Sequence, residues 1–367
     1  MKVLVAGWVG STNLGDELVF AGMRRLLDGH QVAVITTDPA ATRRVHGVGT
    51  ARHDDPGALL RAVGTADAVV FGGGGIVQDV TSPLNLPYHL SRLTIARARR
   101  IPFAAVGLGV GGLETPLGRR LVRPGLRGAV GITVRDAASS QLLADVGVQG
   151  AELAADLAFA LDPPAGSASA EALRVTDHLA VCLRPWSGKS FERMPAGMRG
   201  DITPDAYVAA LADALDRTAA ATGLAVRFVA LQRDRDDAFH ARVAERMSAP
   251  TSRCAPDLEG LLAEVARARA VVSMRYHGGV AAILAGLPTV LISYALKVDA
   301  LARELGEGGR LLGWDPAEFA SLPGAVSSVL DRGEVVVDTR SRLRERQRAN
   351  AALVDRLLDV ASGGGTG

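Results

Sequence analysis

Short apolar runs alternate with helical patterns along most of the chain, and this alternation limits the possible folds more than any single motif does. The runs are continuously apolar, as strands are when helices cover both faces of a parallel sheet. Strands that alternate with helices are typical of βαβ units. In the first half we expect strands near 2–7, 31–36, 67–72, 102–107 and 129–134, and helices near 15–28, 57–64, 87–99, 117–127 and 136–145.

A change of composition at residues 162–169, which are rich in Pro, Ala, Gly and Ser, divides the pattern into two parts. A chain of 367 residues also exceeds the usual size of a single core. In the second part we expect strands near 178–184, 225–231, 270–273 and 288–292, and helices near 204–221, 235–247, 257–267, 278–285 and 298–305. The predicted divisions are an N-terminal Rossmann-like domain over 1–165, a C-terminal one over 175–338, a closing helix over 339–361 and a disordered tail at 362–367.

Composition excludes several classes of protein. The net charge of +2 does not indicate a polyanionic partner such as nucleic acid. Two cysteines without nearby thiol or histidine partners are typical of a reducing compartment and predict neither a disulfide nor a metal site. The apolar start of the chain is too short for a signal peptide, and no run approaches the ~20 residues that span a bilayer. We therefore expect a soluble, cytoplasmic enzyme.

Unusual residues follow the predicted strands, where doubly wound domains bind their ligands. The first such loop, residues 7–17, contains three glycines that allow a ligand to approach the backbone. Its Asn13 and Asp16 either cap the next helix or contact substrate, and Asp16 is a candidate acid or base. Gly15 and Glu17 lie in the same loop.

Four consecutive glycines, residues 72–75, end the third predicted strand. Such a run predicts either a backbone nest for an anion or a sugar hydroxyl, or a tight crossing from strand to helix. Gln78 and Asp79 come next, and they either hydrogen-bond sugar hydroxyls or cap the helix. Residues 107–112 repeat the glycine pattern, whereas the pair Arg135 and Asp136 at a strand end is more often structural than catalytic.

The segment 273–279 combines an arginine and a histidine at a predicted strand-to-helix turn. A helix N-terminus attracts anions, and Arg275 adds a planar fork for phosphate or carboxylate. His277 can move a proton near neutral pH. Arg184 and Lys297 also follow predicted strands, and each is either a further cation for the same ligand or a solvated surface residue.

Together these loops resemble the polysaccharide pyruvyltransferase family over residues 1 to about 305. The stretches that carry the resemblance are residues 7–17, 72–79, 134–136, 155–159, 273–277 and 285–299. The chain departs from the common pattern at Tyr276, where an aliphatic residue is frequent, and at Ala295-Leu296, where Asp-Pro is usual before Lys297.

The resemblance implies two Rossmann-like domains of the glycosyltransferase-B type, an α/β fold with the active site in the interdomain cleft. The family moves the enolpyruvyl unit of phosphoenolpyruvate onto two hydroxyls of one sugar, which gives a cyclic pyruvate ketal and phosphate. Neither a metal nor a cofactor is expected. A glycan or lipid-linked saccharide would be the acceptor, and a lipid carrier would bring the enzyme to the inner membrane face.

An arginine and a histidine of the family map onto Arg275 and His277, and the charges and proton transfers of the reaction suggest roles for further residues. The C-terminal domain would hold phosphoenolpyruvate and the N-terminal domain the acceptor. The expected catalytic residues are His277 and Asp16; the expected phosphoenolpyruvate contacts are Arg275, Arg184, Lys297 and Gly278; and the expected acceptor contacts are Asn13, Gly15, Glu17, Gly73, Gly74, Gln78 and Asp79.

Three alternatives stay open at this point. Glycosyltransferases that use nucleotide sugars share the same architecture. A pyruvyltransferase-like enzyme could act on a small secondary metabolite instead of a glycan. A third alternative is a binding module that has kept the fold and lost the reaction.

Overall fold

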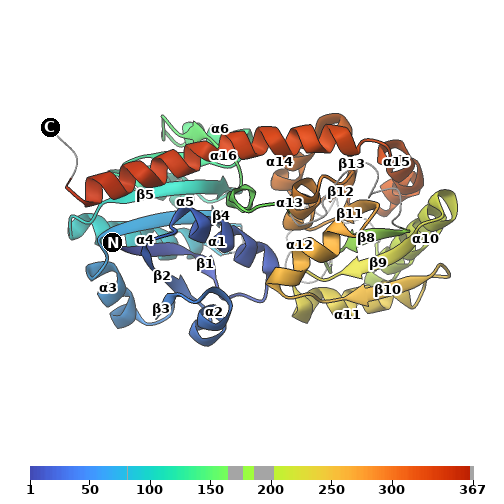
Figure 1. The fold of residues 1–367 in the computed structure, drawn as a ribbon, viewed down its shortest axis with the longest axis horizontal. Helices are drawn as coiled ribbons and strands as arrows, with labels where there is room; N and C mark the ends of the chain where they lie inside the picture. The colour runs from blue at the N-terminus through green and yellow to red at the C-terminus, as the bar shows by residue number, and fades with distance from the viewer. Residues whose placement is uncertain (81, 164–176, 186–201, 364–367) are drawn as a thin grey trace. The chain divides into compact units, whose positions relative to one another are not determined.

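The computed structural model describes residues 1–80, 82–163, 177–185 and 202–363. The chain forms two compact α/β units (Figure 1). The N-terminal unit comprises Met1–Ser11, Asp16–Asp162 and Ser341–Gly367, and the C-terminal unit comprises Thr12–Gly15 and Pro163–Arg340. Most of the predicted linker and the end of the predicted tail lie outside the described residues.

The N-terminal unit is built on a seven-stranded sheet in the order β3-β2-β1-β4-β5-β6-β7, and its paired strands are parallel. The strands are β1 (Lys2–Val9), β2 (Gln31–Thr36), β3 (Gly49–Arg52), β4 (Ala68–Val77), β5 (Phe103–Val110), β6 (Ile132–Val134) and β7 (Glu152–Leu153). The helices are α1 (Leu14–Leu26), α2 (Pro39–His46), α3 (Pro56–Gly64), α4 (Asn85–Ala98), α5 (Pro116–Leu126), α6 (Ala137–Asp145) and the 3₁₀ helix η1 (Leu157–Ala160).

The C-terminal unit contains a six-stranded sheet in the order β10-β9-β8-β11-β12-β13, again with parallel pairs. Its strands are β8 (His178–Cys182), β9 (Ala225–Val229), β10 (Thr251–Cys254), β11 (Ala270–Ser273), β12 (Thr289–Ser293) and β13 (Gly309–Gly313). Its helices are α10 (Pro204–Thr222), α11 (Arg233–Ala244), α12 (Leu258–Ala266), α13 (Tyr276–Ala285), α14 (Leu296–Leu305), α15 (Leu322–Val329) and the 3₁₀ helices η2 (Gly306–Gly308) and η3 (Pro316–Ser321). The last helix, α16 (Gly333–Ala361), begins in the C-terminal unit and continues in the N-terminal one.

Each sheet separates two apolar cores, as the continuously apolar strands predict. In β4, Val69 and Phe71 belong to one core and Val70 to the other. In β11, Val272 and Val271 divide in the same way. Successive side chains of a strand point to opposite faces, so helices on both sides are needed to bury them. The expected fold class, two Rossmann-like α/β domains, is confirmed.

The sequence pattern missed elements with little apolar signal. The strands β3 and β10 lie at sheet edges and consist of Gly-Thr-Ala-Arg and Thr-Ser-Arg-Cys, so no apolar run marked them. The short edge strand β7 also lacks an apolar run. The strand β13 and the helices α2 and α15 were not predicted either.

Two predicted strand ends were wrong. The strands β4 and β5 continue beyond 72 and 107 to Val77 and Val110. Their pairing persists through the glycines, with Gly74 opposite Leu108. The glycines at 72–75 therefore belong to a strand rather than to a loop, because pairing with β5 overrides the weak strand preference of glycine.

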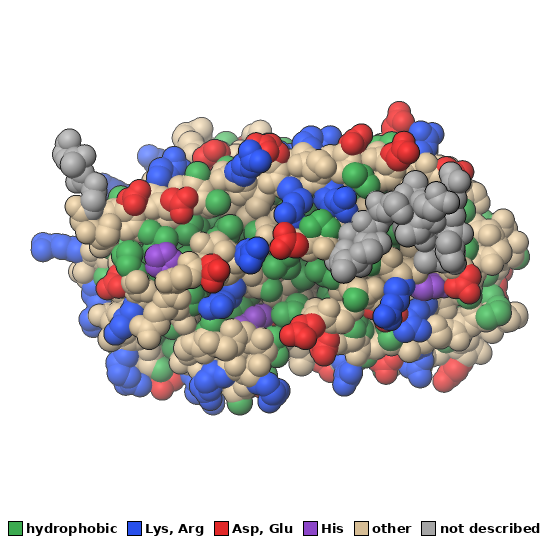
Figure 2. All heavy atoms as spheres, in the orientation of Figure 1, with side chains coloured by type: hydrophobic (Ala, Val, Ile, Leu, Met, Phe, Trp, Pro, Cys, Tyr) green, Lys and Arg blue, Asp and Glu red, His purple; other side chains and the backbone are tan. Residues whose placement is uncertain are grey.

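The distribution of surface charge and the character of the helices bear on whether the protein binds polyanions or crosses a membrane. Acidic and basic side chains are interspersed on the face shown in Figure 2, in keeping with the net charge of +2. In the described part of the chain, no helix combines the length and apolar character needed to cross a bilayer.

Candidate active site

The turn between β11 and α13 brings Arg275 and His277 to the carboxyl edge of the C-terminal sheet. Arg275 precedes the first residue of α13, and His277 is the second residue of that helix. The strand β11 lies between β8 and β12, so the residues after all three strands share one edge. The carbonyl of Cys182, the last residue of β8, accepts hydrogen bonds from the backbone N–H groups of Met274 and Arg275. These bonds fix the turn against the end of β8.

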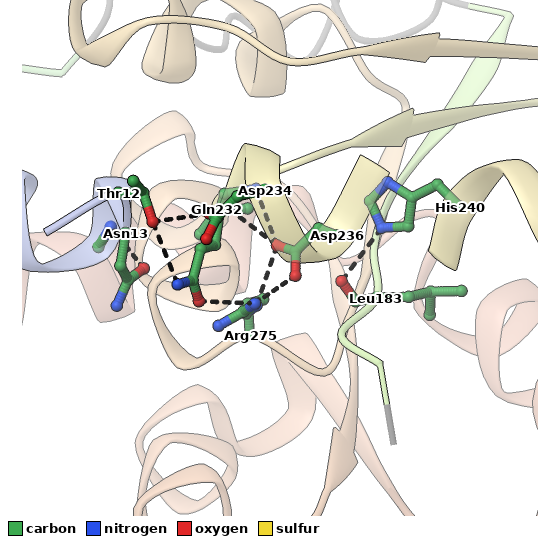
Figure 3. Close-up of polar contacts among 10 residues, drawn as sticks. Thr12, Asn13, Leu183, Gln232, Asp234, Asp236, His240 and Arg275 are labelled. Carbon is green, nitrogen blue, oxygen red and sulfur yellow. Dashed lines mark hydrogen bonds and ion pairs between the residues drawn. The ribbon is translucent and has the colours of Figure 1, made fainter. Parts of the chain in front are cut away.

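A buried carboxylate holds the guanidinium group of Arg275 (Figure 3). Nε of Arg275 donates to Oδ2 of Asp236 at 3.1 Å, Nη2 donates to Oδ1, and Nη2 also lies 3.3 Å from Oε1 of Gln232. Asp236 is fully buried and accepts two more bonds, from the backbone N–H groups of Leu231 and Gln232. The charge of Arg275 is therefore balanced within the protein, and among the described residues its Nη1 takes part in no hydrogen bond.

The segment Thr12–Gly15 belongs to the C-terminal unit and is fastened there by several bonds (Figure 3). Asn13 and Gln232 form an antiparallel bridge, and the N–H of Leu14 donates to the carbonyl of Leu231 at 2.8 Å. The hydroxyl of Thr12 donates to Asp234 at 2.6 Å. The side-chain oxygen of Asn13 accepts from the N–H of Gly15. This segment thus adds residues of the first loop to the strand-end edge that carries Arg275.

Gly15 lies directly against the ring of His277. A β-carbon at position 15 would lie 2.2 Å from Nδ1 of His277, which is far too close. The side chain of His277 is largely buried, and its ring meets that of Tyr276 edge to face at 5.0 Å. Gly278 has a similar constraint, because a β-carbon there would lie 2.4 Å from Oγ of Ser273. The backbone N–H of Gly278 donates to the carbonyl of Arg275. Gly15 therefore allows close packing against the histidine, and Gly278 allows close packing against Ser273.

Arg184 and Lys297 surround the phenol of Tyr294, which directly follows β12. Cζ of Arg184 lies 4.2 Å from the centroid of the tyrosine ring, and Nζ of Lys297 lies 5.6 Å from it. Burial by itself raises the pKa of Tyr294, but the positive charges of Lys297, Arg184 and Arg275, with a hydrogen bond from Lys297, lower it to about 7. Within the described residues, neither Arg184 nor Lys297 forms an ion pair with a carboxylate, and the buried Nε of Arg184 has no hydrogen-bond partner. Among the described residues, this edge therefore carries cations that no carboxylate neutralises.

Sequence reasoning missed Asp236 and gave no role to Tyr294. Asp236 lies in the charged first turn of α11, and a run of charged residues at a helix start predicts exposed side chains. Only the fold brings it to Arg275. Tyr294 lies three residues before Lys297, in a stretch that carries the family resemblance. The sequence did not indicate that Arg184 lies over its ring.

In the N-terminal unit, Asp16 lies in the first turn of α1 and accepts a hydrogen bond from Ser11 at 3.1 Å. Asp16 lines a small pocket together with Trp8, Gly72 and Gly73.

Two other acidic residues of the N-terminal unit are occupied by the protein itself. Glu17 is buried, accepts from the N–H of Gly10 at 2.8 Å and pairs with Nε2 of His46 at 2.7 Å. Asp79 is also buried and accepts from the backbone N–H groups of residues 114 and 115 and from the hydroxyl of Thr115. Burial raises the pKa of Asp79, but these hydrogen bonds outweigh it and lower the value overall. Both carboxylates hold loops in place.

The glycine run makes room for neighbouring protein atoms. Gly72 has a φ of +142°, and a β-carbon there would lie 2.2 Å from the carbonyl oxygen of Val106. A β-carbon on Gly73 would lie 2.8 Å from Val19, whereas one on Gly74 would come no nearer than 4.0 Å to Asp16. Gln78 follows the strand, and its backbone carbonyl accepts from the side chain of Asn85 at 2.7 Å.

Arg135 forms a buried ion-pair network in the N-terminal unit. Its Nε lies 3.2 Å from Asp136 and its Nη1 lies 3.5 Å from Asp156. A β-carbon on Gly109 would lie 2.6 Å from its Cζ. The side chains of all three charged residues are almost completely buried. The pair at positions 135 and 136 is therefore part of the interior.

The two parallel α/β units, with their charged strand-end edge, define the class of protein: a two-domain enzyme fold of the glycosyltransferase-B type. The sequence model of the family described as "Polysaccharide pyruvyl transferase" matches residues 13–295. The match covers most of the chain, and the protein therefore belongs to that family. No protein in a curated collection matches the sequence significantly.

Solved structures share the fold at low sequence identity. UDP-GlcNAc 2-epimerase from Neisseria meningitidis, bound to UDP-GlcNAc, is 11% identical with a TM-score of 0.60 over 98% of this chain and 100% of that one. Anabaena Alr3699/HepE in complex with UDP-glucose is 14% identical with a TM-score of 0.57 over 99% of both chains. Acinetobacter baumannii MurG is 12% identical with a TM-score of 0.55 over 96% of this chain and 99% of that one. At such identities the likeness concerns the fold alone.

Proposed function

We propose that this protein transfers the enolpyruvyl unit of phosphoenolpyruvate to two hydroxyls of a sugar in a glycan, forming a pyruvate ketal and releasing phosphate. The observation that carries the proposal is the positive charge of Arg184 and Lys297 at the strand-end edge of the C-terminal unit, which no carboxylate of the described residues pairs. Phosphoenolpyruvate carries about three negative charges near neutral pH. Two cations that lack a carboxylate partner in the described chain, beside a helix N-terminus, suit such a ligand.

In this proposal Arg184 and Lys297 are the main donor-binding residues. Arg275 contributes through Nη1 only, since Asp236 holds its other nitrogens. Asp236 fixes the plane of the guanidinium group, so a carboxylate or phosphate would meet a preoriented donor at low entropic cost. His277 is the candidate proton-transfer group of the same unit, and Gly15 allows its ring to lie in its observed position.

The reaction needs several proton transfers. A proton must reach C3 of the enol, which leaves C2 open to attack by the first hydroxyl. The C2–O bond to phosphate then breaks, and the second hydroxyl attacks C2. Each hydroxyl releases a proton, so one proton goes to C3 and one leaves with phosphate. We assign His277 to the first addition, with Asp16 as the candidate partner from the N-terminal unit.

The acceptor is proposed to bind along residues of the first loop and the strand-end segment of β4. Asn13, Gly15, Gly73, Gly74 and Gln78 stay candidates for this contact. Glu17 and Asp79 are assigned a supporting role, because their oxygens already accept hydrogen bonds from neighbouring loops. A lipid-linked acceptor would add a contact with the inner membrane face.

Isothermal titration calorimetry with phosphoenolpyruvate and, separately, with UDP-glucose tests the proposal. Wild-type protein should bind phosphoenolpyruvate saturably and Lys297→Met should weaken that binding by at least about 30-fold, which corresponds to losing one partner of a charged contact. The matched control is Arg97→Met, which removes an exposed cation that donates to backbone carbonyls in the N-terminal unit. Binding of UDP-glucose without any binding of phosphoenolpyruvate would overturn the proposal in favour of a nucleotide-sugar enzyme.

A further inference from the structure

Tyr294 has surroundings that a tyrosine in a purely structural position does not need. It directly follows β12, at the same sheet edge as the residues after β8 and β11. Arg184, after β8, lies over its ring, and Lys297, in the first turn of α14, lies at 5.6 Å from the ring centre. Arg275, before α13, adds its field to theirs. Three elements therefore direct positive charge at one phenol.

Two other tyrosines of the chain show what such a ring looks like elsewhere. Tyr207 packs in a core of the C-terminal unit, its hydroxyl meets the sulfur of Met274, and burial raises its pKa. Tyr88 in the N-terminal unit lies beneath Arg92, with Cζ 3.4 Å from the ring centre, and burial still raises its pKa. An arginine stacked on the ring is thus not sufficient to favour the phenolate. Tyr294 differs in the number of cations around it, because the charges of Lys297, Arg184 and Arg275 all act on its phenol, whereas Tyr88 has the charge of Arg92.

We propose that Tyr294 is a proton-transfer residue of the reaction, acting at the step in which phosphate leaves. As the bond between C2 and the phosphate oxygen breaks, the phenol donates its proton to that oxygen. The resulting phenolate, held between Arg184 and Lys297, then takes the proton of the second hydroxyl as that oxygen bonds to C2. One proton enters phosphate and one leaves the hydroxyl, so the residue returns to its starting state. This inference rests on the proposed function.

The surrounding charges explain why the phenol can act in both directions. With its pKa at about 7, the group changes protonation near neutral pH, which is where proton transfer is most efficient. A bound phosphoenolpyruvate anion would offset part of the positive field and keep the phenol protonated before the reaction. Departure of phosphate would restore the field and stabilise the phenolate. His277 is left to serve the first addition, so the two residues divide the proton transfers between them.

The first experiment compares Tyr294→Phe with Tyr207→Phe, which removes a hydroxyl from the core of the same unit. Tyr294→Phe should keep phosphoenolpyruvate binding within threefold of wild type and lower kcat by roughly 100-fold or more. Tyr207→Phe should leave both quantities unchanged. Full kcat in Tyr294→Phe would overturn the inference, because a phenylalanine cannot transfer a proton.

A pH profile separates proton transfer from packing. Replacing Tyr294 by a ring-fluorinated tyrosine lowers the pKa of the phenol with little change in shape. The limb of the kcat/KM profile near pH 7, which reports the free enzyme, should then move to lower pH, whereas a merely structural tyrosine would leave that limb in place. This second variant keeps the test decisive if Tyr294→Phe folds poorly.

A titration without substrate distinguishes a failure of the proposed function from a failure of the role given to Tyr294. The near-ultraviolet absorbance of phenolate should show one group titrating near pH 7 in wild type that is absent from Tyr294→Phe. If that group titrates but the protein does not turn over phosphoenolpyruvate, the proposed function is wrong, and with it the role in phosphate departure. If phosphoenolpyruvate is turned over equally by both proteins, the proposed function stands and the role of Tyr294 is wrong.

Discussion

The two units place charged residues at the carboxyl ends of their strands in opposite ways. In the N-terminal unit, Arg135 is enclosed by two carboxylates, and Glu17 and Asp79 accept bonds from nearby loops. In the C-terminal unit, Arg275 is balanced by Asp236, while Arg184 and Lys297 have no carboxylate partner in the described chain. Buried charges that are paired support the fold, whereas cations left without a counter-ion are available to a ligand. The comparison therefore supports the proposal that the C-terminal unit binds the anionic donor.

The largest expected effect comes from breaking the buried ion pairs, one in each unit. Arg275→Ala and Arg135→Ala each leave a buried carboxylate without its partner, so each should lower the free energy of unfolding by about 3–5 kcal/mol. Urea denaturation measures both values. The two variants should differ in ligand binding, because only Arg275→Ala should also weaken the binding of phosphoenolpyruvate.

A double variant, Arg275→Met with Asp236→Leu, separates the two consequences. Removing both charges should restore most of the stability, since an apolar pair can replace a buried ion pair. Phosphoenolpyruvate binding should stay weak. Recovery of both stability and binding would show that Arg275 serves the fold alone.

Arg184→Met should weaken phosphoenolpyruvate binding by about 30-fold or more with little change in stability. The reason is that Arg184 has no carboxylate partner among the described residues, so its removal leaves no buried charge behind. Calorimetry and urea denaturation of the same preparation give the two numbers. A large loss of stability with unchanged affinity would place Arg184 with Arg135 as an interior residue.

The glycine run of the N-terminal unit gives a smaller effect with an internal control. Gly73→Ala should lower stability by about 1–3 kcal/mol, because its φ is +80° and a β-carbon would lie 2.8 Å from Val19. Gly75→Ala should be nearly neutral, since a β-carbon there comes no closer than 4.0 Å to Arg135. Thermal denaturation tests the pair. If Gly75→Ala abolishes activity while the fold stays intact, position 75 lies against a ligand, unlike Gly73, which lies against Val19.

These residues also show how far the sequence predicts the molecule. Central strands such as β1 and β11 were found because their apolar runs must be buried on both faces. The edge strands β3 and β10 were missed because they bury little and owe their conformation to a neighbour. Apolar runs in the sequence indicate which strands are buried, but they do not indicate which strands pair with each other.

The same limit applies to the candidate site. The position of Arg275 and His277 at a strand-to-helix turn followed from the sequence, because a short strand and an apolar helix flank them. The pairing of Arg275 with Asp236, and of Tyr294 with Arg184, joins residues far apart in the chain. The glycines 72–75 indicated that something approaches the backbone, but only the structure identifies protein atoms as the neighbours of Gly72 and Gly73.

The smallest predicted effect is a pH dependence of stability that only one tyrosine should show. The pKa of Tyr294 is lowered from the ordinary 10.0 to about 7 in the folded protein. Between these values the unfolded chain binds more protons than the folded one, so the stability contributed by the phenolate is present above pH 10 and is lost as pH falls through 7. The free energy of unfolding of wild type minus that of Tyr294→Phe should thus rise from pH 7 to pH 10, by on the order of 1 kcal/mol after solvent screening.

For Tyr207, whose pKa is raised, the corresponding difference should stay level over this window and fall only above the ordinary value. A level difference for Tyr294 as well would mean that the positive charges do not stabilise its phenolate. The cations would then be held apart from the hydroxyl, and the edge of the C-terminal unit would bind anions without contributing this proton-transfer group.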